Sequence, residues 1–338
     1  MRTIALLPVA GLIVAAFACG GSSNQPGFGN PGDGGSSSSG GGSGGSSGSS
    51  GGSGGSSGGL VGDASSSSSG GQMGPAIIYA HTDTELWTMD PTMNNKLTDI
   101  GPFSVGGGTT PTITDLAVDA SGNVFVNSET AIYTAMLPPS GTGTVSLTIH
   151  TQLPSTSKFY ALGFTPPGTL ETNQSLIAGD SAGNLYYIPS SNTATPQLLG
   201  GFGGSWALSG DVVFFSNNGA TLGLATIRTC NGSCTKTNDS LAEIDVAAMK
   251  ANYTSGGSSM PLLKQVFGSG TGYGELFGIG AWGNNVYAFS RAYSGNSAQL
   301  VQVGMSGTGT SLMQFPNITS GWSGAGVTTT APITVVVQ

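Results

Sequence analysis

Histidine, the usual general base of hydrolytic sites, occurs only twice in this chain, at His81 and His150, each within a strand-like run. A nucleophilic serine would need one of these imidazoles as its base, together with a G-x-S-x-G elbow between a strand and a helix. The sequence has no such elbow. We therefore predict no nucleophilic site that uses either histidine.

Two pairs of carboxylates have a spacing that general acid and base catalysis could use. Asp83 and Glu85 stand two residues apart, as do Glu243 and Asp245. Alternate residues share one face of a strand, so one carboxyl group could donate a proton while the other accepts one. A solvated strand face carries the same pattern, and we predict no catalytic residue from these pairs.

Acidic residues in two Gly-containing segments could be read as cation ligands. Asp119 in "VDASGN" and Asp180 in "GDSAGN" stand at what we interpret as equivalent places in two repeats. Calcium requires six or more oxygen ligands, whereas Asp, Asn and Gly together are typical of tight turns. We therefore interpret both residues as turn residues, and we predict neither a metal nor another cofactor.

Two cysteines, Cys230 and Cys234, frame the short segment "CNGSC". A zinc site is one interpretation, but no histidine or further cysteine lies nearby to complete a tetrahedral shell. In an oxidising compartment an even pair across a short turn most simply forms a local disulfide. We predict a Cys230–Cys234 disulfide.

Composition excludes one class of partner. Charged residues make up only 7% of the chain, and the formal net charge is -8, with 8 Lys and Arg against 16 Asp and Glu. Nucleic-acid binders need a basic patch for the phosphate backbone, and this sequence has none. We predict no nucleic-acid partner and a neutral, polar surface rich in Gly, Ser, Thr and Asn.

The N-terminus has the layout of a secretory signal. Arg2 precedes an uncharged apolar segment, residues 4–18, which Pro8 interrupts and which is shorter than the roughly 20 residues that span a bilayer. Ala16, Phe17, Ala18 and Cys19 resemble the lipobox of bacterial lipoproteins. The resemblance implies that residues 1–18 are removed and that Cys19 is diacylated; ordinary secretion with cleavage after Ala18 is the alternative.

A tether is predicted to follow Cys19. Residues 34–59 are only Gly and Ser, so this stretch has no apolar side chains whose burial could offset the entropy of ordering it. We expect residues 19–74 to be a lipidated, disordered linker with a reach on the order of 40 Å. In well-studied lipoproteins, Asp directly after the lipidated cysteine favours retention in the inner membrane, and this chain has Gly20 there. The resemblance therefore implies that the protein is anchored in the outer membrane and faces the surface or the periplasm.

The remaining residues, 75–338, are predicted to form one all-β domain. Short β-rich runs such as "NVFVNS", "NLYYIP" and "NVYAFS" alternate with Gly, Asn, Asp and Pro. Similar small and apolar segments begin at residues 113, 159, 205, 275 and 321, separated by 46, 46, 70 and 46 residues. A period in the forties is that of one four-stranded propeller blade.

The two ends of this domain complement each other. The first unit, "AIIYAHT", "TELWTMD" and "KLTDIGPF", lacks a first strand, and the last segment, "GWSGAGVTTTAPI", lacks the other three. Joining them closes a ring, which removes the unpaired edges. We predict a five-bladed, monomeric β-propeller with N- and C-terminal strand closure; six blades, with the long third unit split in two, is the rival count.

The repeats "ITDLAVDASGNVFVNS" and "ELWTMDPTMNNKLTDIG" resemble those of bacterial β-propeller lipoproteins, a broad class that includes YVTN-type and quinoprotein-like propellers. The resemblance covers most of residues 75–338 and implies a fold, not an activity. Trp206, Trp282 and Trp322 lie in or near first-strand segments, where they could gather at the channel and stack on a ligand, or pack between blades.

We predict a lipid-anchored module of the cell envelope that binds or scaffolds without catalysis. Its ligand would be a glycan or an envelope protein, held by loops on one face, including the long insertion near Cys230. A propeller hydrolase or lyase acting on envelope or extracellular polymers, and a structural surface protein, remain the alternatives.

Overall fold

The computed structural model describes residues 77–333, apart from 157, 194 and 292–296. The predicted signal, lipidation site Cys19 and tether lie outside the described residues. The strands, in chain order, are β1 (Ile78–His81), β2 (Glu85–Asp90), β3 (Lys96–Val105), β4 (Asp115–Val118), β5 (Val124–Asn127), β6 (Ala131–Met136), β7 (Val145–Gln152), β8 (Phe159–Thr165), β9 (Ser175–Asp180), β10 (Asn184–Ile188), β11 (Gln197–Gly201), β12 (Trp206–Asn217), β13 (Ala220–Asn231), β14 (Ser233–Cys234), β15 (Ser240–Ile244), β16 (Leu263–Val266), β17 (Leu276–Trp282), β18 (Asn285–Ser290), β19 (Ala298–Val303), β20 (Gly309–Phe315) and β21 (Gly324–Gly326).

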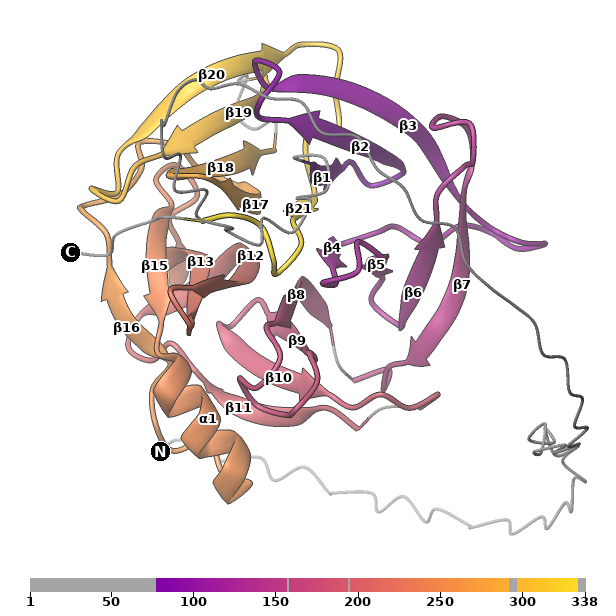
Figure 1. Cartoon of the computed structure of the whole chain (residues 1–338). Coiled ribbons are helices and arrows are strands. Elements are labelled where there is room, and N and C mark those ends of the chain that lie inside the picture. Colours follow the sequence, from indigo (N-terminus) through magenta and orange to yellow (C-terminus); the bar gives the residue numbers. More distant parts are fainter. Residues whose placement is uncertain (1–76, 157, 194, 292–296, 334–338) are drawn as a thin grey trace, which may run out of the picture. The chain divides into compact units, whose positions relative to one another are not determined.

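These strands form antiparallel groups of four, arranged around a common centre (Figure 1). The groups are β21-β1-β2-β3, β4-β5-β6-β7, β8-β9-β10-β11, β12-β13-β15-β16 and β17-β18-β19-β20. A parallel pairing of Phe103–Val105 in β3 with Val145–Leu147 in β7 joins the first two groups into one eight-stranded sheet. The described chain is therefore a β-propeller, with the first strand of each group nearest the centre.

The predicted pairing of the two terminal segments is present. Tyr79, Ala80 and His81 of β1 pair with Gly326, Ala325 and Gly324 of β21. The segments that the repeat analysis placed first in each unit are β4, β8, β12, β17 and β21. Because β21 pairs with β1, the group of β1, β2 and β3 gains its innermost strand, and the ring is closed.

Small residues in the innermost strands have a steric cause. A Cβ on Gly210 of β12 would stand 2.3 Å from the Cα of Phe277 in β17, and one on Gly278 would stand 2.5 Å from the backbone nitrogen of Ala325 in β21. Neighbouring inner strands approach each other with no room for a side chain at these points. The small and apolar character of the repeated segment follows from this crowding.

The longest unit accommodates its extra residues within one sheet. Residues 240–250, "SLAEIDVAAMK", have a pattern that fits either a helix or a strand followed by a turn of helix; the structure has β15 followed by α1 (Val246–Ser255). Asp245 caps α1 through a hydrogen bond from the Ala248 nitrogen, and Gly256 ends it with φ 67°. Among the described residues, no helix has both the length and the apolar character needed to cross a membrane.

Two buried carboxyl groups tie neighbouring inner strands together. Asp115 of β4 accepts a hydrogen bond of 2.6 Å from the Leu162 nitrogen of β8, and Asp211 of β12 accepts one of 2.6 Å from the Ile279 nitrogen of β17. Both side chains are fully buried. They link strands that lie far apart in the sequence.

Burial raises the pKa of Asp115 and that of Asp211 well above their usual range, and the negative charge of Asp211 adds to the rise at Asp115. Each of the two carboxyl groups therefore binds a proton more readily in the folded protein than in the unfolded chain.

Candidate functional site

A cavity of about 770 Å³ opens on the face of the propeller where the innermost strands begin. Its walls come from the segments at the starts of β4, β8, β12, β17 and β21 and from the loops that join the second and third strands of each group. The lining residues are Asp83, Pro111, Thr112, Ile113, Thr114, Ser128, Glu129, Thr130, Tyr160, Ser181, Leu208, Ser209, Gly210, Arg228, Cys234, Lys236, Phe277, Arg291 and Ser323. We call it the channel-mouth cavity; its size lies within the range of small-molecule sites.

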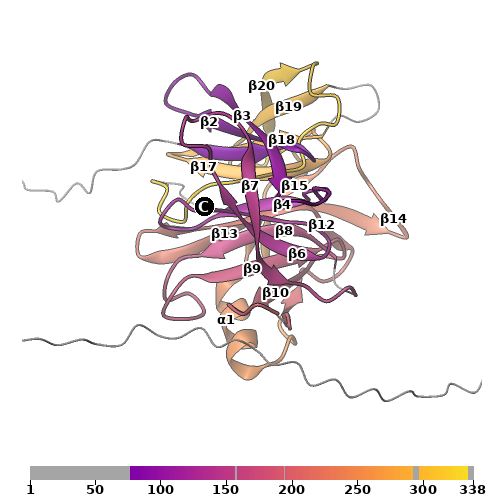
Figure 2. The same cartoon turned by 90° about the vertical axis from the view of Figure 1, so that its right-hand side faces the viewer.

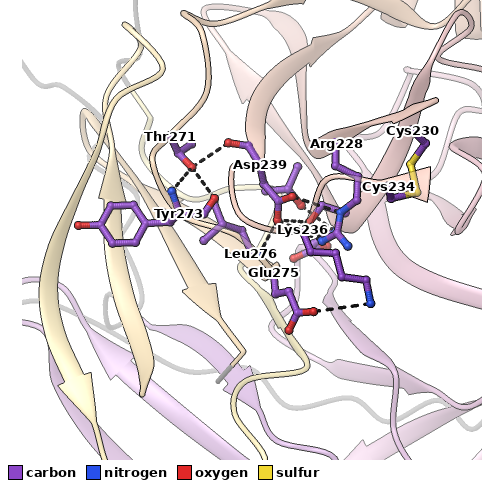
Figure 3. Close-up of polar contacts among 12 residues, drawn as sticks. Arg228, Cys230, Cys234, Lys236, Asp239, Thr271, Tyr273, Glu275 and Leu276 are labelled. Atoms are coloured by element: carbon purple, nitrogen blue, oxygen red, sulfur yellow. Dashed lines mark hydrogen bonds and ion pairs between the residues drawn. A yellow bond between two sulfur atoms is a disulfide. The ribbon is translucent and has the colours of Figure 1, made fainter. Parts of the chain in front are cut away.

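Arg228 of β13 lies at the wall of this cavity and is held from behind by a buried carboxylate. Its Nε lies 3.2 Å from Oδ1 of Asp239, and its Nη2 donates to Oδ2 of Asp239 at 3.2 Å and to the hydroxyl of Ser209 (Figure 3). Burial raises the pKa of Asp239, while the charge of Arg228 lowers it. The guanidinium is thus fixed in one orientation by its own partners.

Asp239 also fastens the loop after β13 to the start of β17. Its Oδ2 accepts from the backbone nitrogen of Leu276 at 2.9 Å, and its carbonyl accepts from the hydroxyl of Thr271 at 2.8 Å (Figure 3). One carboxylate therefore fixes a charged wall residue and the loop that carries it. This arrangement makes the wall a preformed surface.

A second arginine, Arg291, also lines the cavity and lies against Phe277. Nη2 of Arg291 donates to Oδ2 of Asp83 at 2.9 Å, and Asp83 also accepts a hydrogen bond from the hydroxyl of Ser323. The guanidinium carbons of Arg228 and Arg291 lie 5.7 and 5.9 Å from the centre of the Phe277 ring. Cation–π contacts of this kind hold both arginines against one aromatic ring.

The remaining charges at the rim are also paired. Nζ of Lys236 lies 4.0 Å from Oε1 of Glu275, and Nζ of Lys158, beside the cavity, lies 3.0 Å from Oε2 of Glu129. Each cation at the cavity therefore has a carboxylate partner. The cavity presents charged groups without a large excess of either sign.

Hydroxyl groups supply most of the other polar atoms. Seven Ser and Thr residues line the cavity, namely Thr112, Thr114, Ser128, Thr130, Ser181, Ser209 and Ser323. Half-exposed Tyr160 adds an aromatic ring. Each hydroxyl can both donate and accept a hydrogen bond, so the cavity suits a polar ligand with many hydroxyl or amide groups.

The predicted disulfide is confirmed, and it lies at the cavity. Cys230 at the end of β13 is bonded to Cys234 in β14, which pairs with β13 (Figure 3). β14 extends from the sheet stack in the side view (Figure 2), and Cys234 and Lys236 line the cavity. The insertion that the sequence placed among the recognition loops therefore contributes directly to the cavity wall.

A second, smaller cavity of about 380 Å³ lies beside the same turn between β9 and β10 that contributes Ser181 to the first cavity. It is lined by Ala182, Asn184, Gly201, Phe202, Gly203, Gly204, Trp206, Ser258, Ser259, Met260 and Pro261. Ser181 lines the channel-mouth cavity and the next residue, Ala182, lines this one. A single turn separates the two hollows.

The three tryptophans do not gather in the channel. Trp206 is half-buried and lines the second cavity, while half-buried Trp282 lies at the end of β17, away from the face where that strand begins. Trp322 is fully buried, with its ring edge-on to Trp87, Phe289 and Phe315 at centroid distances of 5.4 to 6.0 Å. Trp322 therefore packs the core, because its indole has no open side for the ligand contact predicted from the sequence.

The histidines lie away from the cavity wall. His81 is fully buried, its Nδ1 is 2.6 Å from the Thr82 carbonyl, and burial lowers its pKa to about 4. Nδ1 is therefore the donor, and Nε2 is a buried acceptor without a hydrogen-bond partner among the described residues. His150 of β7 is half-buried and lies edge-on to Phe125 at 5.1 Å.

The two carboxylate pairs do not share strand faces. Asp83 lies in the turn before β2, where Glu85 begins the strand, and only Asp83 lines the cavity. Glu243 of β15 binds Nζ of Lys264 at 2.7 Å, whereas Asp245 is the cap of α1. The expectation that each pair shares one face of a strand was wrong, because β2 begins after Asp83 and β15 ends before Asp245.

The turn interpretation of Asp119 and Asp180 agrees with their contacts. Oδ1 of Asp119 accepts from the nitrogens of Ser121 and Asn123 at 2.8 and 2.9 Å. Oδ1 of Asp180 accepts from the nitrogens of Ala182 and Asn184. Their places are not equivalent, however, because Asp119 follows the first strand of its group and Asp180 follows the second. Across residues 77–333 as described, no cluster of three His, Cys, Asp or Glu side chains could hold a metal ion.

Sequence reasoning missed the residues that define the cavity: Arg228, Lys236, Asp239, Phe277 and Arg291. One signal was available, since Arg228 is the single charge in the strand "ATLGLATIRTCN", and a charge inside such a strand needs a partner. The spacing does not identify the partner of Arg228, which is Asp239, 11 residues later and beyond the disulfide loop. For Arg291 the partner depends on the whole fold, because Asp83 lies 208 residues away in sequence.

Comparisons with known proteins show likeness of architecture at low identity. No family model matches the chain, and no curated protein is found similar to it. A solved protein of unknown function from Bacteroides caccae is 9% identical, with a TM-score of 0.43 over 75% of this chain and 98% of that one. The WD40 propeller domain of Doa1 is 9% identical, with a TM-score of 0.35 over 72% of this chain and 79% of that one. PorZ of Porphyromonas gingivalis, a bacterial surface component of the type-IX secretion system, is 12% identical, with a TM-score of 0.28 over 71% of this chain and 32% of PorZ.

Proposed function

We propose that this protein is a noncatalytic binding module of the cell envelope, which takes its ligand in the channel-mouth cavity. The observation that carries the proposal is the construction of that cavity. Its charged wall residues, Arg228 and Arg291, are held by Asp239 and Asp83, and its rim is built from loops of all the sheet groups. A wall that is already fixed loses little entropy when a ligand binds, which favours recognition.

The proposal includes a five-bladed propeller. Each antiparallel group of four strands counts as one blade, and the eight-stranded sheet counts as two because its halves meet only through the short parallel pairing of β3 with β7. The long unit, which a six-bladed ring would split, supplies one group with β14 and α1 as excursions. We also propose that the repeats are of the YVTN or quinoprotein-like lipoprotein type, a resemblance that supports the propeller fold and not a particular number of blades.

The first test blocks the cavity. Ser181 is exposed at the rim, so Ser181→Trp places a large ring in the opening, whereas Ser121→Trp adds the same ring to the turn after β4, at the far end of that strand. Binding of the labelled full chain to a glycan array and to purified envelope proteins should be lost with Ser181→Trp and kept with Ser121→Trp. Equal binding by both variants would refute the assignment of the site.

The second test concerns the anchor and the location. We propose that Cys19 carries two acyl chains and that the propeller hangs from the outer membrane on residues 20–74. The intact mass of the membrane form should exceed that of the mature chain by the mass of the lipid, and Cys19→Ala should abolish the difference. Protease treatment of unbroken cells should release a surface-exposed propeller through the Gly and Ser stretch and spare a periplasmic one. A freely soluble, unmodified mature protein would refute the anchor.

A further inference from the structure

We infer that the channel-mouth cavity and the smaller cavity beside it are adjoining subsites for one ligand, a neutral oligosaccharide. The inference rests on the proposed function, because it specifies the ligand of the same face. Two observations carry it: the charge balance of the first cavity and the position of the second cavity directly across one turn.

The charges of the first cavity disfavour an anionic ligand. An acid would have to compete with Asp239 for Arg228, with Asp83 for Arg291 and with Glu275 for Lys236, since each cation already lies within 4.0 Å of its own carboxylate. Arg228 is the most firmly held, with 8% of its side chain exposed and its carboxylate partner fully buried. The net charge of -8 on the chain also repels anions approaching from solution.

The same pairs suit a neutral polyol. Arg291 and Asp83 place donors and acceptors next to each other, with 34% and 28% of their side chains exposed. Neighbouring sugar hydroxyls can donate to the carboxylate and accept from the guanidinium without separating the pair. The exposed hydroxyls of Thr112, Thr130 and Ser181 add further partners of both kinds, and Tyr160 offers a ring.

The second cavity extends this site in one direction. Two chain segments pass from one cavity to the other: the turn, at Ser181 and Ala182, and the start of β12, where Trp206 lines the small cavity and Leu208 the large one. A ligand that crosses this ridge therefore contacts both hollows. Trp206 is the aromatic residue of the second subsite that can stack on a sugar ring, and Asn184 is a polar side chain in its wall.

The experiment measures affinity against chain length. Neutral oligosaccharides of about two to six units, from glucans, mannans, galactans and chitin, are titrated into the full chain by calorimetry, with polygalacturonate oligosaccharides as the acidic comparison. We expect one neutral series to bind, with affinity rising about tenfold or more as the ligand grows long enough to reach the second cavity. Binding should change less than about twofold between low and high salt, because no counterions are displaced.

Variants separate the two subsites. Trp206→Ala should abolish the gain with length while leaving the affinity for the shortest ligand unchanged, and Trp282→Ala, at the other end of an inner strand, should alter neither. Since Trp206 also packs against the core, Ser258→Trp provides an independent variant that fills the second cavity without removing a buried group. Both variants should give the same loss.

Several results would overturn the inference. They are salt-sensitive binding of the acidic series alone, affinity independent of length, a length effect that survives both Trp206→Ala and Ser258→Trp, or a peptide ligand with no binding of any neutral sugar. In the last case, loss of peptide binding in Ser181→Trp would still support the cavity as the binding site. The proposed function itself fails only when Ser181→Trp leaves binding intact.

Discussion

Replacing Asp115 with asparagine should remove a pH dependence from the stability of the propeller. Asp115 is fully buried, as is Asp211, and burial raises the pKa of its carboxyl group. Asparagine resembles the protonated acid: its oxygen can accept from the Leu162 nitrogen, and its amide can donate to the neighbouring acceptors, Asp211 or Nε2 of His81. That imidazole nitrogen and Oδ1 of Asp115 both lie within 2.4 Å of the point where a Cβ on Gly324 would stand, which places them in the same small space.

Proton linkage gives the direction and the size of the expected change in the free energy of unfolding with pH. Because the pKa of Asp115 is raised in the folded state, the folded protein binds a proton there that the unfolded chain releases above its ordinary pKa. The free energy of unfolding of the wild type therefore falls as pH rises, by about 1.4 kcal/mol per pH unit for one such proton, until the folded pair releases it. Asp115→Asn has no proton to lose at this position. The variant should become steadily more stable relative to the wild type from about pH 5 upward.

The assay is urea unfolding of both proteins at half-unit pH steps, compared at each pH so that all other titrating groups cancel. A difference between the two free energies that is constant with pH would refute a raised pKa of Asp115 in the folded protein. Asp211→Asn is the matched control. Both oxygens of Asp211 accept backbone hydrogen bonds, from Val212 and Ile279, and an amide would turn one acceptor into a donor facing a donor. We expect that variant to be destabilised by about 1–3 kcal/mol at low pH, and this loss should shrink as pH rises, because the pKa of Asp211 is raised as well.

Three further perturbations test the packing and the charges. The pKa of His81 is lowered to about 4, so His81 stays neutral in the folded state while the unfolded chain takes up a proton below pH 6.5. The free energy of unfolding of the wild type should therefore fall by about 3 kcal/mol between pH 6.5 and pH 4, and His81→Gln should remove this fall in the same urea assay. Trp322→Ala should lower the free energy of unfolding by about 3–5 kcal/mol, because it empties a fully buried site among three aromatic rings, and a loss near zero would contradict the packing role. Arg228→Gln should cost about 3–5 kcal/mol by leaving the Asp239 carboxylate buried without its cation, and Arg228→Gln with Asp239→Asn should recover part of that loss.

Much of the strand order was predictable because each strand obeys local rules. The segments "KFYALGF", "SLIAG", "NLYYIP" and "PQLLGGF" became β8 to β11, since β-branched and aromatic residues fill them and Gly, Asn and Asp separate them. The pairing of β1 with β21 was also predictable, because a unit lacking its first strand and a terminal segment with nothing else to pair must complete each other. The spacing of the repeats is enough to predict the strand order and the pairing of β1 with β21, without any knowledge of side-chain contacts.

The site was less predictable, because local spacing says nothing about where strands begin and end. Asp83 and Glu85 fit a strand pattern, yet the backbone nitrogen of Thr82 bonds the carbonyl of Glu85, and the resulting turn sends Asp83 towards Arg291. The three tryptophans were grouped by sequence position alone. Trp322 and Trp206 precede or begin inner strands while Trp282 ends one, so their rings stand at different depths of the molecule. Side-chain direction depends on the strand end and face, which short motifs do not specify.

The cavity and the buried carboxyl pair have a common physical origin. An inner strand in a propeller leaves its channel-facing edge unpaired, so its backbone nitrogens need other acceptors in a region that water enters poorly. Asp115, Asp211 and Asp239 meet this need by accepting from Leu162, Ile279 and Leu276, which are residues of inner strands. Two of these acids are fully buried and have raised pKa values, and the third, at the mouth, is balanced by Arg228. Arg228 therefore balances the charge of a carboxylate that the fold uses as a hydrogen-bond acceptor for β17. A ligand in the cavity meets an arginine whose orientation Asp239 has already fixed.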